Sequence, residues 1–222
     1  MSTVLIIGAD PNIGLGTAKI FASAGYKVAI ASRSKTSESY KYYPFDASKP
    51  ETVSQLFAAV SKDLGGPNVV IYNGELYFYA PFSSIMPIYA TLEESSDTGI
   101  PAKEAVEGLS RAGAGGTFIF TGNKLNVAGV PHSLGFEMGK SASAHLIRAA
   151  SNGFEGTGYN TPTISMPRFY YVDQRQSDGE ITYPTGAEAH GNTFLELAQD
   201  PKQRSWHYTF VDGKGYVDFQ ER

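Results

Sequence analysis

The glycines near the amino terminus have the spacing of a turn that holds a pyrophosphate. The apolar run Val4–Ile7 leads into a turn that contains Gly8, Gly14 and Gly16. Glycine lets the backbone come close to a pyrophosphate, whose charge is favoured at the N-terminus of the helix that follows. Asn12 stands where a further glycine would be expected, and asparagine also tolerates a left-handed backbone. The alternative is an ordinary strand–helix turn with unrelated glycines.

The dipeptide Ser32-Arg33, which ends the next apolar run, predicts which dinucleotide binds. An acidic residue at this place would bind the ribose 2′-hydroxyl of NAD and repel a 2′-phosphate. Serine does not repel a phosphate, and a guanidinium matches it bidentately, so NADP(H) is favoured over NAD(H). Asp10 argues mildly against this because it adds negative charge inside the glycine turn. Alternatively, Arg33 is a surface arginine at a strand end.

Strands and helices are expected to alternate along the whole chain. The expected strands are 4–7, 27–31, 68–72, 116–121, 163–166 and 208–211. The expected helices follow the glycine turn and then cover 51–64, 103–112, 135–152 and 186–197. This alternation predicts a single α/β domain over residues 1–222, with a Rossmann-like, doubly wound fold and a mostly parallel sheet. The segments 76–98 and 168–186 are expected to be loops at the carboxyl ends of strands, where such sheets bind ligands.

Composition excludes several classes of protein. A chain of 222 residues, 41% of them hydrophobic, can bury one core of ordinary size. The net charge of −4, without a basic cluster, argues against a nucleic-acid partner. The chain has no cysteine, and His145, His190 and His207 lack metal-ligand spacing, so no metal is expected. No apolar stretch is long enough for a membrane span or signal peptide, so we expect a cytoplasmic protein without a membrane partner.

From residue 3 to about residue 216 the order of motifs resembles the short-chain dehydrogenase/reductase family. Residues 8–14 resemble its glycine turn, Asp46 its adenine-contacting aspartate, and residues 72–74 its Asn-Asn-Ala-Gly segment. Residues 211–213 resemble its Val-Asp-Gly, and residues 166–168 replace its Pro-Gly. The resemblance implies cofactor contacts by Gly8, Asp10, Asn12, Ile13, Gly14, Ser32, Arg33, Asp46, Asn73, Gly74, Lys140 and Pro167. Asp46 could instead be an acid before a helix, and Asn73 could simply close a turn.

The catalytic positions depart from that family. Its reductive chemistry uses a tyrosine as general acid, a lysine that lowers the pKa of this tyrosine, and a serine that polarises the carbonyl. Asn123 and Phe136 have the spacing expected of that serine and tyrosine, and neither carries a hydroxyl. Lys140 remains, on the same helix face as Phe136. The standard mechanism is therefore not available as written.

His132 is our candidate for the substitute proton donor, because histidine titrates near neutral pH and this one lies in the loop before Phe136. It could equally be a polar surface residue. Glu137, Ser133, Tyr170 and Tyr171 are weaker candidates of the same kind.

Three functions are compatible with these residues. The first is an NADP(H)-dependent oxidoreductase that acts on a carbonyl or secondary alcohol through a non-standard proton donor. The second is a non-redox enzyme, a cyclase or isomerase, and the third is a catalytically silent nucleotide sensor or binding protein. Aromatic residues in 77–82 and 169–171 predict a pocket for an apolar, ring-containing small molecule, or else a buried dimer surface. The family's pairing through the helix that carries Lys140 implies a homodimer or homotetramer.

Overall fold

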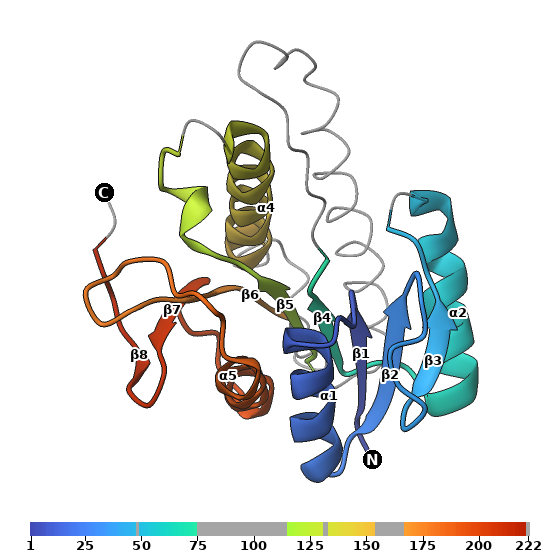
Figure 1. Ribbon diagram of the computed structural model, residues 1–222. Helices are drawn as coiled ribbons and strands as arrows, with labels where there is room; N and C mark the ends of the chain where they lie inside the picture. Colours follow the sequence, from blue (N-terminus) through green and yellow to red (C-terminus); the bar gives the residue numbers. More distant parts are fainter. Residues whose placement is uncertain (48, 75–114, 131–132, 154–166, 221–222) are drawn as a thin grey trace.

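One eight-stranded sheet runs through the molecule and carries helices on both faces (Figure 1). The computed structural model describes residues 1–47, 49–74, 115–130, 133–153 and 167–220. The strand order is β3-β2-β1-β4-β5-β6-β7-β8, and every neighbouring pair except β7–β8 is parallel. The strands are β1 (Thr3–Ile7), β2 (Lys27–Ser32), β3 (Lys41–Pro44), β4 (Val69–Tyr72), β5 (Thr117–Thr121), β6 (Arg168–Gln174), β7 (His207–Val211) and β8 (Gly215–Tyr216). The predicted α/β fold with a mostly parallel sheet is confirmed.

The helices cover the two faces because apolar side chains alternate along each strand. The face with Val4 and Ile6 packs against α1 (Ile13–Ser23) and α5 (Ala187–Gln199). The face with Leu5 and Ile7 packs against α2 (Val53–Leu64) and α4 (Leu134–Gly153). Two short 3₁₀ helices, η1 (Pro50–Thr52) and η3 (Lys124–Asn126), precede α2 and follow β5. Within the described ranges no helix is long and apolar enough to cross a membrane.

Gly16 serves helix packing rather than a ligand. A Cβ at this position would lie 2.7 Å from the Cβ of Ala187, so the missing side chain lets α1 and α5 come together. This corrects the expectation that Gly16 belongs to a pyrophosphate turn.

The direction of the chain reverses between β1 and β4. From β1 it runs outward through β2 to β3, and it returns to place β4 on the other side of β1. Loops from adjacent strands therefore diverge at the carboxyl ends of β1 and β4, which opens a crevice where such sheets bind ligands. The segment that connects β1 to α1 lies at this crevice.

The prediction of a loop over 168–186 is wrong for its first part, because β6 occupies Arg168–Gln174 and every residue of this strand is buried. The polar residues at both ends of this strand made the segment resemble a loop in the sequence. Arg168 donates from Nη2 to Thr117 Oγ1 at 2.7 Å, a partner 51 positions away, and Asp173 pairs with Arg175 two positions on, so the charged residues of this segment have partners although they are buried. β3 and β8 were also missed. The expected strand 163–166, helix 103–112 and loop 76–98 lie outside the described residues.

Candidate nucleotide-binding site

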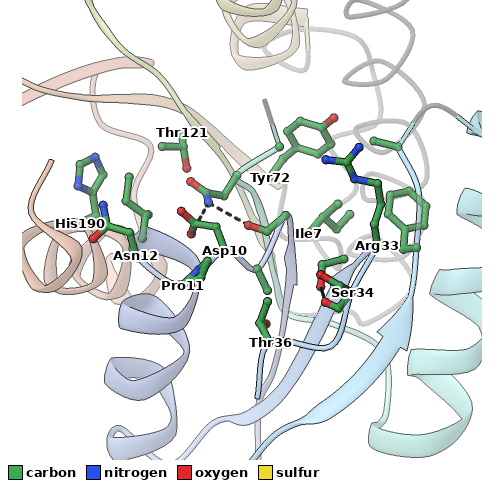
Figure 2. Close-up of a pocket in the computed structure, with 18 of the residues that line it drawn as sticks. Ile7, Asp10, Pro11, Asn12, Arg33, Ser34, Thr36, Tyr72, Thr121 and His190 are labelled. Atoms are coloured by element: carbon green, nitrogen blue, oxygen red, sulfur yellow. Dashed lines mark hydrogen bonds between the residues drawn. The ribbon is translucent and has the colours of Figure 1, made fainter. Parts of the chain in front are cut away.

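A cleft of about 530 Å³ opens at the carboxyl ends of β1, β2, β4 and β5, beside the N-terminus of α1 (Figure 2). Its volume is in the usual range for small-molecule and cofactor sites. Ten of the predicted site residues line it: Gly8, Asp10, Asn12, Ile13, Ser32, Arg33, Asp46, Asn73, Gly74 and Asn123. The fold thus brings together residues that are up to 115 positions apart, from Gly8 to Asn123.

Gly8 is required where the turn leaves β1. Its φ of +80° is in the left-handed region, and a Cβ there would lie 2.6 Å from the backbone carbonyl group of Asn73. The Nδ2 group of Asn73 donates to the Gly8 carbonyl at 2.9 Å. Asn73 therefore stabilises the turn at the end of the neighbouring strand β1 while it also lines the cleft, and its contact with a cofactor stays a prediction.

Asp10 is held inside the turn. Its Oδ1 accepts from the Gly14 backbone N–H at 2.5 Å. The same oxygen accepts from Asn73 Nδ2 at 3.1 Å, the contact that a dashed line to Asp10 marks in Figure 2. A carboxylate at a helix N-terminus is stabilised by the unpaired N–H groups and the helix dipole. Much of the negative charge of Asp10 is therefore compensated by the protein itself. Gly14 is buried and is not among the cleft-lining residues, because its N–H faces Asp10.

Asn12 is not left-handed: its φ is −95°. The strained position in this turn belongs to Gly8. The Asn12 carboxamide instead donates from Nδ2 to Thr185 Oγ1 at 3.2 Å and to the Thr185 carbonyl at 3.4 Å. This contact joins the glycine turn to the segment that follows β6.

Arg33 forms the other end of the cleft, next to Ser34 and Thr36. It is exposed, and it forms no ion pair with any acidic residue that the structure describes. The Ser32 hydroxyl donates to the Ser34 carbonyl at 2.7 Å, which fixes this loop. Thr36 Oγ1 is buried in the cleft wall and lacks a hydrogen-bond partner within the described residues. Asp46, half-buried, lines the same end.

Lys140 lies behind the cleft wall and is not among the lining residues. Its side chain is fully buried, and Nζ donates to the Thr121 carbonyl at 3.3 Å. Nζ also lies 4.8 Å from the Phe120 ring centroid and 5.1 Å from that of Phe136, which are cation–π contacts. The prediction that Phe136 and Lys140 share a helix face is confirmed. Contact between Lys140 and a cofactor stays a prediction.

Pro167 was predicted as a cofactor contact, and the structure contradicts this. Pro167 precedes β6, whose first residue, Arg168, pairs with Thr117, the first residue of β5. Pro167 is therefore at the amino edge of the sheet, opposite the cleft. The resemblance placed the strand before Pro167, whereas it comes after.

The aromatic run 169–171 does not form a ligand pocket. Phe169, Tyr170 and Tyr171 lie within β6 and are fully buried on alternating faces of the sheet. Residues 77–82 and His132 lie outside the described residues. Glu137 has a structural role, since its Oε1 accepts from the Val130 N–H at 2.6 Å and the Ser133 hydroxyl at 3.0 Å.

Sequence reasoning missed two residues that line the cleft from the far part of the chain, Thr185 and His190. His190 is buried on α5, its Nδ1 lies 2.9 Å from the Gly186 carbonyl, and burial lowers its pKa. Hydrogen bonding to Gly186 and the charges of Asp173 and Asp10 partly oppose that shift. The only sequence signal was the expectation that the segment after β6 lies at the carboxyl edge of the sheet.

No group of three or more His, Asp or Glu side chains that could hold a metal occurs among the described residues.

Fold and cleft together define a doubly wound α/β protein with a nucleotide-type crevice at its switch point. No protein-family model matches the chain. The short chain dehydrogenase/reductase dmxR12 of Cryptosporiopsis sp. (strain 8999) is 34% identical over 239 residues, covering 97% of this chain and 94% of that protein. Glucose 1-dehydrogenase of Gluconobacter oxydans (strain 621H) is 27% identical over 178 residues, covering 73% of this chain and 67% of that protein. The chain therefore belongs to the short-chain dehydrogenase/reductase family.

Solved structures agree on the fold. Alcohol dehydrogenase from the archaeon Thermococcus sibiricus, complexed with 5-hydroxy-NADP, superposes with a TM-score of 0.74 at 18% identity. The match covers 99% of this chain and 100% of that chain.

Proposed function

We propose that the protein is an NADP(H)-dependent oxidoreductase that acts on a carbonyl compound or a secondary alcohol without a tyrosine general acid at position 136. Arg33 is the observation that carries the cofactor assignment: an exposed guanidinium at the cleft end with no acidic partner in the described residues. A guanidinium binds a phosphate bidentately, which favours a cofactor with a 2′-phosphate. The archaeal relative in fold, which was crystallised with an NADP derivative, supports the same choice.

The cleft residues fit such a cofactor. The turn at Gly8 leaves no room for a side chain, and the N-terminus of α1 favours a pyrophosphate next to it. Two buried hydroxyl oxygens in the cleft wall, Thr36 Oγ1 at the Arg33 end and Thr121 Oγ1 at the β5 end, have no partner in the described chain. Arg33 and Thr36 would hold the 2′-phosphate, and Asp46 the adenosine end. The bound cofactor would supply the hydride.

The proton needs a source other than residue 136, because a phenyl ring cannot donate one. We retain His132 or an ordered water as the first candidates. General acid catalysis is typically worth about 10²–10⁴-fold, so NADPH oxidation with simple aldehydes, ketones and quinones should be weak. Restoring both hydroxyls, with Asn123→Ser and Phe136→Tyr together, should raise that activity. A robust reductase that His132→Ala leaves unchanged would show that the proton donor is elsewhere.

Titration with NADPH and NADH, followed by quenching of the single tryptophan, Trp206, tests the cofactor. NADPH should bind more tightly, and Arg33→Ala should remove most of the preference, about 1–3 kcal/mol for a charge-assisted contact. Arg33→Lys should keep part of it, because lysine retains the charge but loses the planar fork. Lys19→Ala, which removes an exposed charge from α1 outside the cleft, is the matched control.

Equal affinities for the two nucleotides in the unaltered protein would overturn the assignment. Brisk turnover without nucleotide would favour the non-redox enzyme. Tight NADPH binding with no turnover of any carbonyl would identify a sensor.

A further inference from the structure

The N-termini of α1 and α5 meet beside the cleft. The Asn12 carboxamide, at the N-cap of α1, donates to Thr185, and the next residue, Gly186, is the N-cap of α5. The two helices touch behind this contact, since a Cβ on Gly16 would lie 2.7 Å from that of Ala187. Each N-terminus has unpaired N–H groups and the positive end of a helix dipole. This corner of the cleft therefore favours an anion.

His190 lies at the same corner, where it lines the cleft with only 1% of its surface exposed. Its Nδ1 lies 2.9 Å from the Gly186 carbonyl, one helical turn earlier. A carbonyl oxygen only accepts, so Nδ1 carries the proton of the neutral ring and Nε2 carries the lone pair. Nε2 has no hydrogen-bond partner within the described residues. A buried polar atom without a partner is costly, so this nitrogen is suited to contact a ligand.

The corner beside His190 has no permanent cation among the described residues. Of the described residues that line the cleft, only Arg33 is an arginine or lysine, and it lies at the end opposite His190 (Figure 2). The charged groups that face His190 are both acidic: Asp10 from the glycine turn and Asp173 from β6. β7 and α5 itself contribute aromatic rings. In the described cleft wall, His190 is therefore the side chain that can become the counter-ion of an anion bound here.

We propose that His190 takes up a proton from solvent when the dinucleotide binds, and that its imidazolium donates from Nε2 to the pyrophosphate. This inference rests on the proposed function for a ligand that has a pyrophosphate, but not for the 2′-phosphate or the redox reaction. In the free protein burial lowers the pKa of His190 and so favours the neutral ring. A pyrophosphate brought next to the ring favours the charged form and raises this pKa. Affinity for the dinucleotide should therefore rise as the pH falls.

Calorimetry of the unaltered protein with NADH tests the proton uptake without requiring turnover. NADH has the pyrophosphate but not the 2′-phosphate, and a phosphate of that kind titrates by itself near about pH 6. Binding enthalpies measured at pH 6.5 in two buffers of different ionisation enthalpy should reveal the uptake of about half a proton. The dissociation constant should be about five- to twentyfold lower at pH 5.5 than at pH 7.5. Binding without proton uptake, or weaker binding at pH 5.5, would overturn the inference.

Nuclear magnetic resonance assigns the proton to His190. Its imidazole signal is the one that disappears in His190→Gln, whose carboxamide can still donate to Gly186 but cannot take up a proton. In the unaltered protein this signal should titrate at a higher pH with NADH bound than without it. His190→Gln should weaken NADH binding about five- to twentyfold at pH 5.5 and change it little at pH 7.5. An imidazole signal that titrates alike with and without NADH would contradict the inference.

His145→Gln is the matched control variant. It removes an exposed histidine of α4 that does not line the cleft, so the pH dependence of NADH binding should stay as in the unaltered protein. Adenosine 2′-monophosphate is the matched control ligand: it lacks a pyrophosphate, and its binding should not depend on residue 190. Equal affinities for NADPH and NADH at pH 7.5, with proton uptake at His190, would overturn the proposed cofactor preference alone. A preference for NADPH without proton uptake at His190 would overturn this inference alone.

Discussion

The two halves of the carboxyl edge of the sheet differ in whether their charged side chains are exposed or buried. At the nucleotide half, formed by β1, β2 and β4, Arg33 is exposed and faces a cleft. At the other half, formed by β5, β6 and β7, Lys140, Asp173 and Arg175 are almost completely buried. The first half leaves its cation exposed at the cleft, whereas the cations of the second half contact its own elements. The charges of the two halves can therefore be changed separately by mutation.

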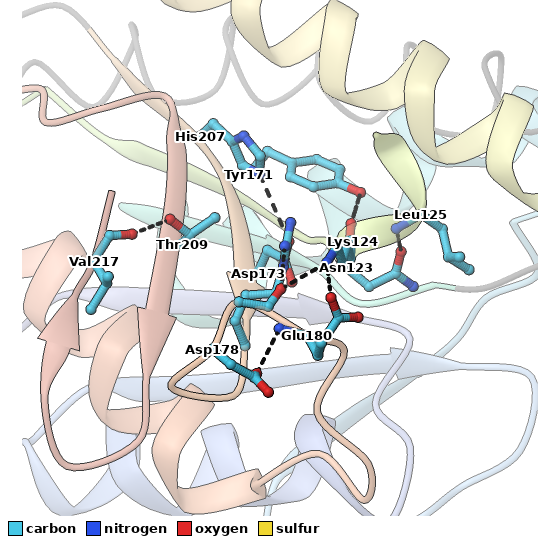
Figure 3. A network of polar contacts seen from close by, with 12 residues as sticks. Asn123, Lys124, Leu125, Tyr171, Asp173, Asp178, Glu180, His207, Thr209 and Val217 are labelled. Carbon is cyan, nitrogen blue, oxygen red and sulfur yellow. Dashed lines mark hydrogen bonds and ion pairs between the residues drawn. The ribbon is translucent and has the colours of Figure 1, made fainter. Parts of the chain in front are cut away.

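The ion pair between Asp173 and Arg175 shows that charged side chains of the second half are buried and pair with each other. Arg175 Nε lies 2.5 Å from Asp173 Oδ2, both side chains have no exposed surface, and Arg175 Nη1 donates to the Gly179 carbonyl at 3.0 Å (Figure 3). Lys124 Nζ donates to the same carbonyl at 3.0 Å. The hairpin after β6 is thus tied to the segment after β5 through the Gly179 carbonyl, which accepts from both cations.

Asp173→Ala should cause the largest loss of stability, because it leaves the Arg175 charge buried without its counter-ion. Breaking such a pair costs about 3–5 kcal/mol in the free energy of unfolding, measured by urea denaturation. The double variant Asp173→Leu with Arg175→Met should recover much of this, since an apolar pair has no charge to desolvate. Glu38→Ala, which breaks the exposed pair with Lys35, is the control and should change little. A small loss for Asp173→Ala would mean that water reaches the pair.

Gly8→Ala should cause the next largest effect and acts on the nucleotide half. The left-handed φ costs about 1–2 kcal/mol with a side chain, and the 2.6 Å approach to the Asn73 backbone adds overpacking of about 1–3 kcal/mol. The glycine turn must shift, so NADPH binding should be lost. Gly25→Ala separates the two causes, because Gly25 also has a positive φ, +84°, but a Cβ there meets nothing within 4 Å. That control should lose some stability and keep NADPH binding.

The same division explains which residues the sequence could predict. Gly8, Asp10 and Asn73 act within one strand–turn–helix unit and the end of the adjacent strand, so their types and order point to the cleft. Sequence separation is not the reason, since Gly8 and Asn73 are 65 positions apart. The difference is that Tyr171, which meets Asn123 across 48 positions, belongs to a strand that the sequence did not indicate.

The error at β6 has a related cause. A strand that starts with arginine and ends with aspartate and glutamine resembles a loop in sequence, since buried charge is costly without a partner. Thr117, 51 positions away, is the partner of Arg168, and only the tertiary structure shows it. Arg175 follows Asp173 by two positions, but the sequence does not show that both are buried. Pro167 was misplaced for the same reason. The strand was expected before Pro167, at residues 163–166, whereas β6 begins after it, at Arg168.

The smallest effect we predict concerns pH and a residue that lines the nucleotide half from α5. Burial of His190 lowers its pKa below the ordinary 6.5, so the unfolded chain takes up a proton at a higher pH than the folded protein does. The free energy of unfolding should therefore be highest above about pH 6.5 and fall as the pH drops toward the folded pKa. Urea denaturation of the unaltered protein and His190→Gln at pH 7.5, 6.5 and 5.5 measures the difference. The variant should lose stability at every pH, because the imidazole packs edge-on against Phe194 and Phe210, but its loss should shrink as the pH falls. A difference that does not change with pH would show that His190 titrates alike in both states, and that its burial beside the cleft carries no electrostatic cost.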